Sequence, residues 1–306
     1  MPYRLNIWGL YHVEIPDQIH IGSRGFYIPI PHHRFRFTLI HAFVYFSLVI
    51  FIGYKIYTHK PSSFTVAQDG TDVRGDGFVA HNMTIRNSAY PREGAAVAFT
   101  SEANRTALHR CRLEAYQSTV YARYGLQFYR DCHVHGTVDI IFGRARALFQ
   151  NCFVYAGKPI LGHNITITAQ GRSSAREQSA FSLQNCTIMA NPALGVLEAR
   201  KLRGFLGNPW RPFSTTVVML SYLGTLILPE GWLQNKERSA IGTLRTVYYG
   251  EYGNRGPGAN TSGRVKRPRY RPALTRATAL NFTIARLIAG EEWLPSTGIR
   301  YTAGLM

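Results

Sequence analysis

Short apolar segments recur along most of the chain, and each carries a similar phrase in which polar residues flank one cysteine or methionine. The phrases are HNMTI, HRCRL, RDCHV, QNCFV and QNCTI, centred on Met83, Cys111, Cys132, Cys152 and Cys186. Successive centres lie 28, 21, 20 and 34 residues apart. Self-similarity at such intervals is typical of solenoids, in which each repeat forms one coil and insertions lie in loops. The pattern predicts an all-β fold, a right-handed parallel β-helix.

The four cysteines are predicted to occupy equivalent positions in neighbouring coils. Equivalent positions in adjacent strands lie about 4.8 Å apart, with side chains pointing the same way. A disulfide needs Cβ atoms about 3.8 Å apart and a convergent geometry. We therefore expect an inward-facing ladder of buried thiols, with one or two disulfides as the alternative. Zinc is not expected, because no Cys-x-x-Cys or paired histidine spacing accompanies the cysteines.

The start of the chain lacks this repeat, so we divide the sequence into an extension, 1–61, and a β-helix domain, 62–306. Within the extension, 37–54 is a mostly apolar run without formal charge, just long enough to cross a bilayer as a helix. A membrane anchor is predicted there. The alternatives are an unusually placed signal peptide, a buried segment and an error of gene prediction. Cations flank both ends of the run, so the positive-inside rule does not fix an orientation.

Near the end of the chain, 278–289 has a partly helical spacing of apolar residues and is followed by Gly290. This pattern predicts a helix that packs along the solenoid as a cap. Several asparagines lie in glycosylation sequons, but only Asn104 and Asn260 lie in predicted loops. These two are the candidate glycan acceptors of a secreted domain.

The chain is strongly basic. Lys and Arg number 35 against 17 Asp and Glu, which gives a net charge of +18 and a pI near 10.1. Such a surface attracts polyanions. No nucleic-acid-binding motif is visible, so nucleic acid is not an expected partner. The alternative is a basic surface that only serves solubility.

One carboxylate interrupts an apolar stretch, VHGTVDIIFG, at 134–143. The β-branched and aromatic residues of this stretch and its closing glycine predict a strand that runs through Asp139. Because an ionised carboxylate is costly to bury unless it is paired or hydrogen-bonded, Asp139 is a candidate functional residue. The alternative is a buried strand aspartate that backbone N–H groups satisfy.

The segments around Asp139 follow a recognisable order. They read HRCRLEAYQSTVYARYGLQFYRDC, RARALFQNCFV, ITAQGR, LGNPW, VVMLSYL, VYYGEYGNRGPGA and WLPSTGIRYTAGL. In this order and spacing, 75–305 resembles the catalytic domain of plant pectinesterases. The resemblance implies a right-handed parallel β-helix, methyl-esterified homogalacturonan (pectin) as substrate and no cofactor. It also implies secretion to the cell wall and a pectinesterase inhibitor protein as a candidate partner, while 37–54 would anchor the chain to a membrane.

The chain departs from the family near the start of this domain. In the family, several strands separate the phrase matched by 62–72 from the phrase matched by 73–87, whereas here the two are contiguous. We therefore expect some N-terminal coils of the family's β-helix to be absent.

Ester hydrolysis by two carboxylates needs an ionised acid that attacks the carbonyl, a protonated acid that serves the departing methoxide, and donors that hold the oxyanion. The resemblance assigns the attack to Asp139 and an oxyanion contact to Gln117. Ser118 stands where the family has its second acid. Because a hydroxyl has a far higher pKa than a carboxyl, Ser118 cannot supply a proton comparably. A new role for Ser118 as nucleophile is disfavoured, since no base is predicted within reach.

Four further positions are expected at the substrate cleft. Ala95 stands where the family has a second oxyanion glutamine, and Asn208 where the family has the arginine that pairs with the attacking aspartate. Trp210 and Trp232 match tryptophans that line the family's sugar cleft, with core packing as the alternative for both.

These departures leave three hypotheses for the function. The first is a pectin methylesterase that turns over slowly through Asp139. The second is a non-catalytic relative that retains the groove and binds pectin. The third is a truncated product that scarcely accumulates.

Overall fold

The computed structural model describes residues 4–7, 11–14, 64–66, 70–89, 96–160, 162–233, 243–266 and 268–305. The chain divides into two compact units, Met1–Phe64 and Thr65–Met306. In the first unit, β1 (Arg4–Ile7) pairs with β2 (Tyr11–Glu14) in antiparallel fashion. The predicted anchor at 37–54 lies outside the described residues. Within the described ranges, no helix is long and apolar enough to cross a membrane.

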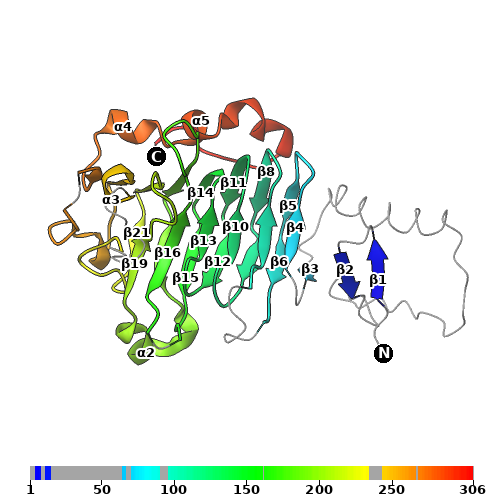
Figure 1. Ribbon diagram of the computed structural model, residues 1–306, viewed down its shortest axis with the longest axis horizontal. Helices are drawn as coiled ribbons and strands as arrows, with labels where there is room; N and C mark the ends of the chain where they lie inside the picture. Colours follow the sequence, from blue (N-terminus) through cyan, green and yellow to red (C-terminus); the bar gives the residue numbers. More distant parts are fainter. Residues whose placement is uncertain are drawn as a thin grey trace, which may run out of the picture. The chain divides into compact units, whose positions relative to one another are not determined.

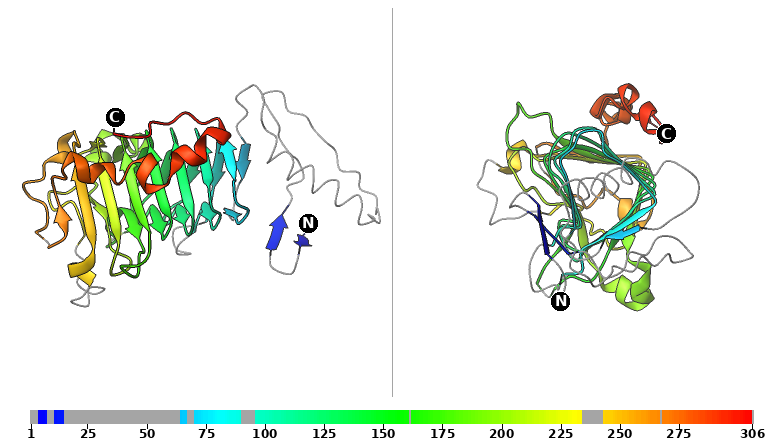
Figure 2. Two further views of the ribbon diagram at one scale, coloured as in Figure 1. Left: turned by 90° about the horizontal axis from the view of Figure 1, so that it is seen from above. Right: turned by 90° about the vertical axis from the view of Figure 1, so that its right-hand side faces the viewer.

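The second unit is a parallel β-helix whose three sheets run along its axis (Figures 1 and 2). The orders are β19-β16-β13-β10-β7-β4 in the six-stranded sheet, β23-β22-β20-β17-β14-β11-β8-β5 in the eight-stranded sheet and β21-β18-β15-β12-β9-β6-β3 in the seven-stranded sheet. From β3 to β22, hydrogen-bonded neighbours are therefore never consecutive strands, because the chain visits each sheet in turn and moves on by one coil; only β22 and β23, at the end of the eight-stranded sheet, are both consecutive and paired. The predicted fold class is confirmed.

The strands are short, as expected where the chain bends at three corners of every coil. The six-stranded sheet contains β4 (Thr71–Val73), β7 (Phe99–Ser101), β10 (Val120–Ala122), β13 (Ile141–Gly143), β16 (Ile165–Gln170) and β19 (Gly204–Gly207). The eight-stranded sheet contains β5 (Val79–His81), β8 (Thr106–His109), β11 (Leu126–Arg130), β14 (Arg146–Gln150), β17 (Ala180–Gln184), β20 (Thr215–Met219), β22 (Tyr248–Tyr252) and β23 (Tyr270–Arg271). The seven-stranded sheet contains β3 (Phe64–Val66), β6 (Met83–Arg86), β9 (Arg112–Glu114), β12 (His133–Gly136), β15 (Phe153–Ala156), β18 (Thr187–Ala190) and β21 (Tyr222–Leu223).

The register of the seven-stranded sheet reproduces the repeat seen in the sequence. Thr84 pairs with Arg112, Arg112 with His133, His133 with Phe153 and Phe153 with Thr187. These partners are 28, 21, 20 and 34 residues apart, the same intervals that separate the cysteine phrases. The cysteine spacing therefore predicted the length of each coil.

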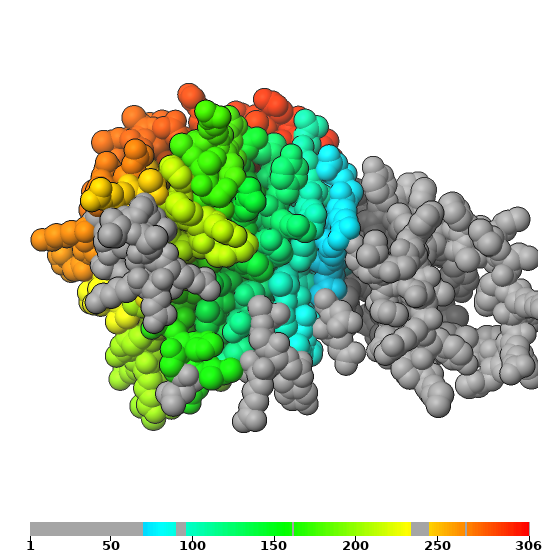
Figure 3. Space-filling model, in the orientation of Figure 1, coloured from blue at the N-terminus to red at the C-terminus, as the bar shows by residue number. Residues whose placement is uncertain are grey.

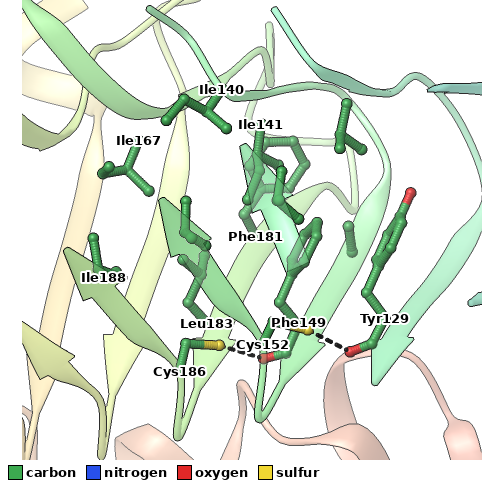
Figure 4. Close-up of a cluster of buried hydrophobic side chains, with 14 of the residues drawn as sticks. Tyr129, Ile140, Ile141, Phe149, Cys152, Ile167, Phe181, Leu183, Cys186 and Ile188 are labelled. Carbon is green, nitrogen blue, oxygen red and sulfur yellow. Dashed lines mark hydrogen bonds between the residues drawn. The ribbon is translucent and has the colours of Figure 1, made fainter. Parts of the chain in front are cut away.

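The four cysteines form the predicted ladder of buried, free thiols on the inner face of the coils. Each thiol donates to a carbonyl oxygen one coil back: Cys111 to Ala80 at 3.6 Å, Cys132 to Leu108 at 3.4 Å, Cys152 to Tyr129 at 3.3 Å and Cys186 to Phe149 at 3.4 Å. Figure 4 shows the last two of these bonds among the buried side chains. Burial raises the pKa of the Cys132 and Cys152 thiols, so both stay protonated.

A left-handed residue precedes every phrase centre and turns the chain from the eight-stranded to the seven-stranded sheet. These residues are Asn82 (φ 53°), Arg110 (φ 55°), Asp131 (φ 53°), Asn151 (φ 58°) and Asn185 (φ 51°), followed one coil later by Leu220 (φ 56°). Asparagine tolerates this conformation best among residues with a Cβ atom, which explains the Asn in three of the phrases.

The C-terminal segment packs along the outer face of the eight-stranded sheet (Figure 2). The predicted single helix at 278–289 is wrong in detail, because two short helices form instead, α4 (Arg276–Leu280) and α5 (Ile284–Leu287). Thr283 separates them with an extended backbone, which breaks the helical hydrogen-bond series. The apolar contact that the pattern implied is present. It joins Ile284, Ile288, Trp293 and Leu294 to Ala107, Phe128 and Leu148.

The remaining helices are short and lie in connections. They are η2 (Pro192–Leu194), α2 (Gly195–Lys201), α3 (Thr243–Thr246), η3 (Pro257–Ala259), η4 (Gly290–Glu292) and η5 (Leu294–Thr297).

A buried ion pair stabilises the C-terminal end of the solenoid. The Arg264 guanidinium meets the Glu251 carboxylate through two bonds, Nε to Oε1 at 2.8 Å and Nη2 to Oε2 at 3.1 Å. Both side chains are almost completely buried. The Tyr270 hydroxyl and the Trp232 indole also donate to Oε1, at 2.7 and 3.2 Å. The carboxylate is thus fully satisfied, as a buried charge requires.

Candidate active site

Asp139 does not lie within a strand, as the sequence predicted, but in the turn between β12 and β13. Its backbone is left-handed, with φ 48°, and its side chain is half-buried. The run of β-branched and apolar residues is therefore interrupted by a corner of the solenoid, which apolar content alone does not reveal. The turn places Asp139 just before the first residue of β13 in the six-stranded sheet.

Ser118 occupies the same corner one coil earlier. Val120 pairs with Ile141, and Ser118 and Asp139 each precede these partners by two residues. Both have the left-handed conformation, with φ 56° at Ser118. Adjacent coils are about 4.8 Å apart, so the two positions are direct neighbours at this corner of the solenoid, which we call the outer wall. The Ser118 backbone N–H donates to the Val138 carbonyl oxygen at 2.9 Å, which joins the two turns.

Gln117 precedes Ser118 in the same turn and is half-buried. Gln117 is therefore the chain neighbour of the corner residue Ser118, one coil before Asp139. The structure thus places three of the residues that the sequence singled out, Gln117, Ser118 and Asp139, in two neighbouring turns.

Thr166 holds the Asp139 carboxylate from the following coil. The Thr166 hydroxyl donates to Asp139 Oδ1 at 2.6 Å and accepts from the Asp139 backbone N–H at 2.7 Å. Thr166 itself is buried, and its carbonyl oxygen accepts from the Ile140 N–H at 3.1 Å. These bonds fix the turn and one carboxylate oxygen. The sequence analysis missed Thr166 because only the coil register shows which threonine faces the turn.

Asn208 lies in the connection after β19 and is 7% exposed. Its backbone N–H donates to the Thr168 carbonyl oxygen at 2.9 Å. Its side-chain oxygen is buried and finds no hydrogen-bond partner among the described residues. The side chain therefore supplies no charge and makes no bidentate contact of the kind an arginine could make. Ala95, the other altered position, lies outside the described residues.

An aromatic platform, which we define as Tyr121, Phe142 and Trp210, covers the outer face of the six-stranded sheet. The Tyr121 and Phe142 rings stack with centroids 4.3 Å apart and planes 8° apart. The Trp210 ring approaches both edge-on, at 6.3 and 6.0 Å. All three are half-buried, so one face of the cluster meets solvent. Such surfaces suit sugar rings.

The sequence analysis predicted Trp210 but missed the other two members of the platform. A signal was present, since Tyr121 and Phe142 each follow the wall residues Ser118 and Asp139 by three positions. Two guanidinium groups border the platform. Arg123 lies 5.8 Å from the Tyr121 ring centre and Arg211 lies 5.6 Å from the Trp210 ring centre. Arg123 is also ion-paired with Glu102, so Arg211 is the bordering cation for which no ion pair is described.

Trp232 has the contacts of a core residue. It is 1% exposed, stacks on Tyr249 with centroids 4.1 Å apart, and donates its indole N–H to Glu251. The structure thus favours the packing alternative over a place in the cleft. Burial raises the pKa of the Tyr249 phenol, and the negative charge of Asp139 raises it further.

Two histidines of β12 lie near the site but on a different face. The His135 ring packs against Tyr155 at 4.9 Å, and the His133 ring against Phe153 at 5.0 Å, on the seven-stranded sheet. Burial, helped by nearby Arg112, lowers the pKa of His135 to about 4. These rings are neutral near pH 7. Among the described residues, no group of three or more His, Cys, Asp or Glu could hold a metal ion.

The chain belongs to the pectinesterase family. The sequence profile of the family described as Pectinesterase matches residues 49–291. The fold places Asp139, for which the resemblance predicted the attack on the ester carbonyl, in the half-buried turn between β12 and β13.

Individual relatives agree with the assignment of the chain to this family. The chain is 46% identical over 231 residues to a pectinesterase/pectinesterase inhibitor of Ficus pumila var. awkeotsang, a match that covers 76% of this chain and 42% of the relative. It is 45% identical over 231 residues to pectinesterase 2.1 of Solanum lycopersicum, with 76% and 41% covered. The chain thus spans less than half the length of these curated relatives.

A solved structure supports the same fold. The pectin methylesterase from carrot superposes with a TM-score of 0.73 at 34% identity, and the match covers 79% of this chain and 78% of the carrot chain. The missing early coils that the sequence predicted are not tested by this overlap and stay a prediction.

Proposed function

We propose that this chain is a carboxylic ester hydrolase that removes methyl groups from homogalacturonan in pectin. The observation that carries the proposal is the position of Asp139, half-buried on the outer wall and held at one oxygen by Thr166. The aromatic platform lies on the adjoining sheet and offers a surface on which sugar rings can lie.

In the proposed reaction, the Asp139 carboxylate attacks the methyl ester carbonyl. The Gln117 amide donates to the oxyanion of the tetrahedral intermediate, which collapses to an acyl-enzyme as methoxide leaves and takes a proton from water. A second water hydrolyses the acyl-enzyme and regenerates the Asp139 carboxylate. This hydrolysis also releases two protons, one of which neutralises the hydroxide left by the first water. The products are therefore one galacturonate carboxylate, one methanol and one proton.

The turnover is expected to be slow, because the site lacks its proton donor. Ser118 can hydrogen-bond the departing oxygen but cannot protonate it, and general acid-base help is typically worth about 10² to 10⁴ in rate. Asn208 adds no cation beside Asp139. Losses at residues that act together do not simply add, yet several orders of magnitude are expected.

The second candidate function is pectin binding without turnover. The specific observation that favours it is the set of altered residues around Asp139, namely Ser118 in place of an acid and Asn208 in place of a cation. The aromatic platform would serve binding in either case.

We further propose that the chain is secreted to the cell wall, and that 37–54 anchors it to a membrane. An exposed Asn260 in a sequon supports exposure to the secretory pathway. Asn104 is a weaker acceptor, because its side-chain oxygen already accepts from the Leu126 N–H at 3.1 Å. A pectinesterase inhibitor protein is a candidate partner, supported by the paired names of the curated relatives.

Methanol release from methylated pectin by the purified full chain tests the proposed function. Slow release that Asp139→Ala abolishes supports the esterase. Retained binding of methylated pectin with no release from either protein supports the binding alternative. Loss of both binding and release would refute both functions, provided that circular dichroism shows a folded β-helix.

A further inference from the structure

One long segment before Glu291 carries charge of one sign only. From 252 to 290 the sequence has eight Lys or Arg residues and no Asp or Glu. Most of this segment forms the connections around β23 at the C-terminal end of the solenoid, drawn in orange in Figure 1. The neighbouring carboxylate, Glu251, is buried and already paired with Arg264. It therefore does not offset the exposed charge.

We define the C-terminal cationic patch as Lys266, Arg269, Arg271 and Arg276, all of them exposed. The Arg271 guanidinium donates to two backbone carbonyl oxygens, those of Pro268 at 2.8 Å and Tyr270 at 3.2 Å. Within the part of the chain that the structure describes, no carboxylate pairs with any of the four cations. Some other surface arginines differ in this respect, since Arg86 and Arg144 each bind a glutamate.

The backbone beneath the patch is held in place. The Val265 N–H donates to the Glu230 carbonyl oxygen at 3.0 Å, and the Leu274 N–H to the Glu251 carbonyl oxygen at 2.9 Å. Tyr270 pairs with Tyr249 in the adjacent strand. Of the residues in these backbone contacts, Glu230 alone has an exposed carboxylate, and it lies in the connection after β21. The cations therefore project from a fixed frame, with an excess of positive charge.

We propose that the C-terminal cationic patch binds demethylated homogalacturonan, a polyanion with one carboxylate on each sugar. This inference rests on the proposed function, because removal of methyl esters produces this polymer. Guanidinium groups bind carboxylates in bidentate fashion, and several weak exposed pairs add up when one chain carries all the anions. Figure 3 shows the orange segment on the molecular surface, open to such a chain.

The distance along the solenoid axis between the patch and the candidate active site is short compared with a pectin polymer. In the eight-stranded sheet, β14 belongs to the coil of Asp139, and β17, β20, β22 and β23 follow in order. Four steps of about 4.8 Å place the patch on the order of 20 Å along the axis from the turn of Asp139. A demethylated stretch bound at the patch would keep neighbouring methylated sugars close to the aromatic platform.

Binding to polygalacturonate, measured with the full chain carrying Asp139→Ala so that no turnover occurs, tests the proposal. The test variant adds Lys266→Gln, Arg269→Gln and Arg271→Gln. The matched control instead adds Arg105→Gln, Arg110→Gln and Arg200→Gln, which removes the same charge from exposed arginines elsewhere. We expect about ten-fold weaker binding for the patch variant, a smaller loss for the control, and a shallower salt dependence for the patch variant.

Three outcomes would overturn the proposal. These are equal binding by the two triple variants, equal affinity of the parent for fully methylated pectin and polygalacturonate, and a preference for a single-stranded oligonucleotide of equal charge. None of these binding results changes the outcome expected for methanol release. Conversely, absence of methanol release would refute catalysis without changing the binding comparison, so the two failures are distinguishable.

Discussion

At the scale of the residue, the chemistry of the site depends on how the Asp139 carboxylate is held. The family arginine is absent at Asn208, and the Thr166 hydroxyl is the side-chain group observed on Asp139 Oδ1. This hydrogen bond fixes the orientation of the Asp139 carboxylate. Thr166 is therefore a positioning residue, although it would not itself touch the ester.

Thr166→Val should lower the rate of methanol release by about ten-fold to a hundred-fold, because a hydrogen bond to a charged group is lost. The KM for pectin should change little, since no contact with the sugar is removed. Thr166→Ser retains the hydroxyl and should recover most of the rate. A Thr166→Val enzyme with unchanged kcat would contradict the positioning role.

The pH dependence of stability should reflect His135. Its folded pKa, about 4, lies below the ordinary value of 6.5 because the ring is buried. Between these values the unfolded chain binds a proton that the folded chain does not, so stability rises with pH from 4 to 6.5 and is fully present above 6.5. His135→Gln should flatten this rise in urea unfolding. His163→Gln, on an exposed loop, is the control, and an equal slope in all three proteins would exclude His135 as a cause.

At the scale of the element, the length of each coil could be predicted from the sequence, but the turn at Asp139 could not. The spacing of the cysteine phrases gave the coil lengths because one inward-facing position repeats in every coil. The left-handed turn at Asp139 is not visible in an apolar run, since Gly136 to Gly143 reads equally well as one strand. Trp232 resembles a cleft residue by motif, yet the ion pair beneath it, which makes it a core residue, forms only when distant coils stack.

Arg110 offers a test of the corner. It is exposed and holds the left-handed conformation that asparagine adopts in the equivalent turns before Met83, Cys152 and Cys186. Arg110→Asn should raise the free energy of unfolding by about 0.5 to 1 kcal/mol, since the strain of a non-glycine left-handed residue falls. Arg110→Ala removes the same side chain without this benefit and should show no gain. Equal stability of the two variants would contradict the argument.

At the scale of the whole molecule, a solenoid needs its ends protected. The Glu251–Arg264 pair lies under the last coils and joins the connection after β22 to the core. Glu251→Gln should destabilise the domain by about 3 to 5 kcal/mol, because it leaves the Arg264 charge buried without a counter-charge. Glu291→Gln, at an exposed carboxylate, should be neutral by thermal unfolding. A loss below 1 kcal/mol for Glu251→Gln would show that the pair does not support this end.

The catalytic assignment concerns the molecule as a whole, because the site joins three coils. Gln117 and Ser118, Asp139, and Thr166 each come from a different coil, and the register aligns them. Sequence motifs identified the first three, while Thr166 and the aromatic platform needed the structure. The altered residues mark the site as incomplete, although its frame is intact.

Methanol release by a restored enzyme tests the central claim most directly. The full chain carrying Ala95→Gln, Ser118→Asp and Asn208→Arg regains the oxyanion donor, the acid and the cation. We predict that it releases methanol from methylated pectin at least a hundred-fold faster than the parent chain, and that adding Asp139→Ala removes this activity. Restored turnover that survives Asp139→Ala would contradict the claim that this carboxylate attacks the ester.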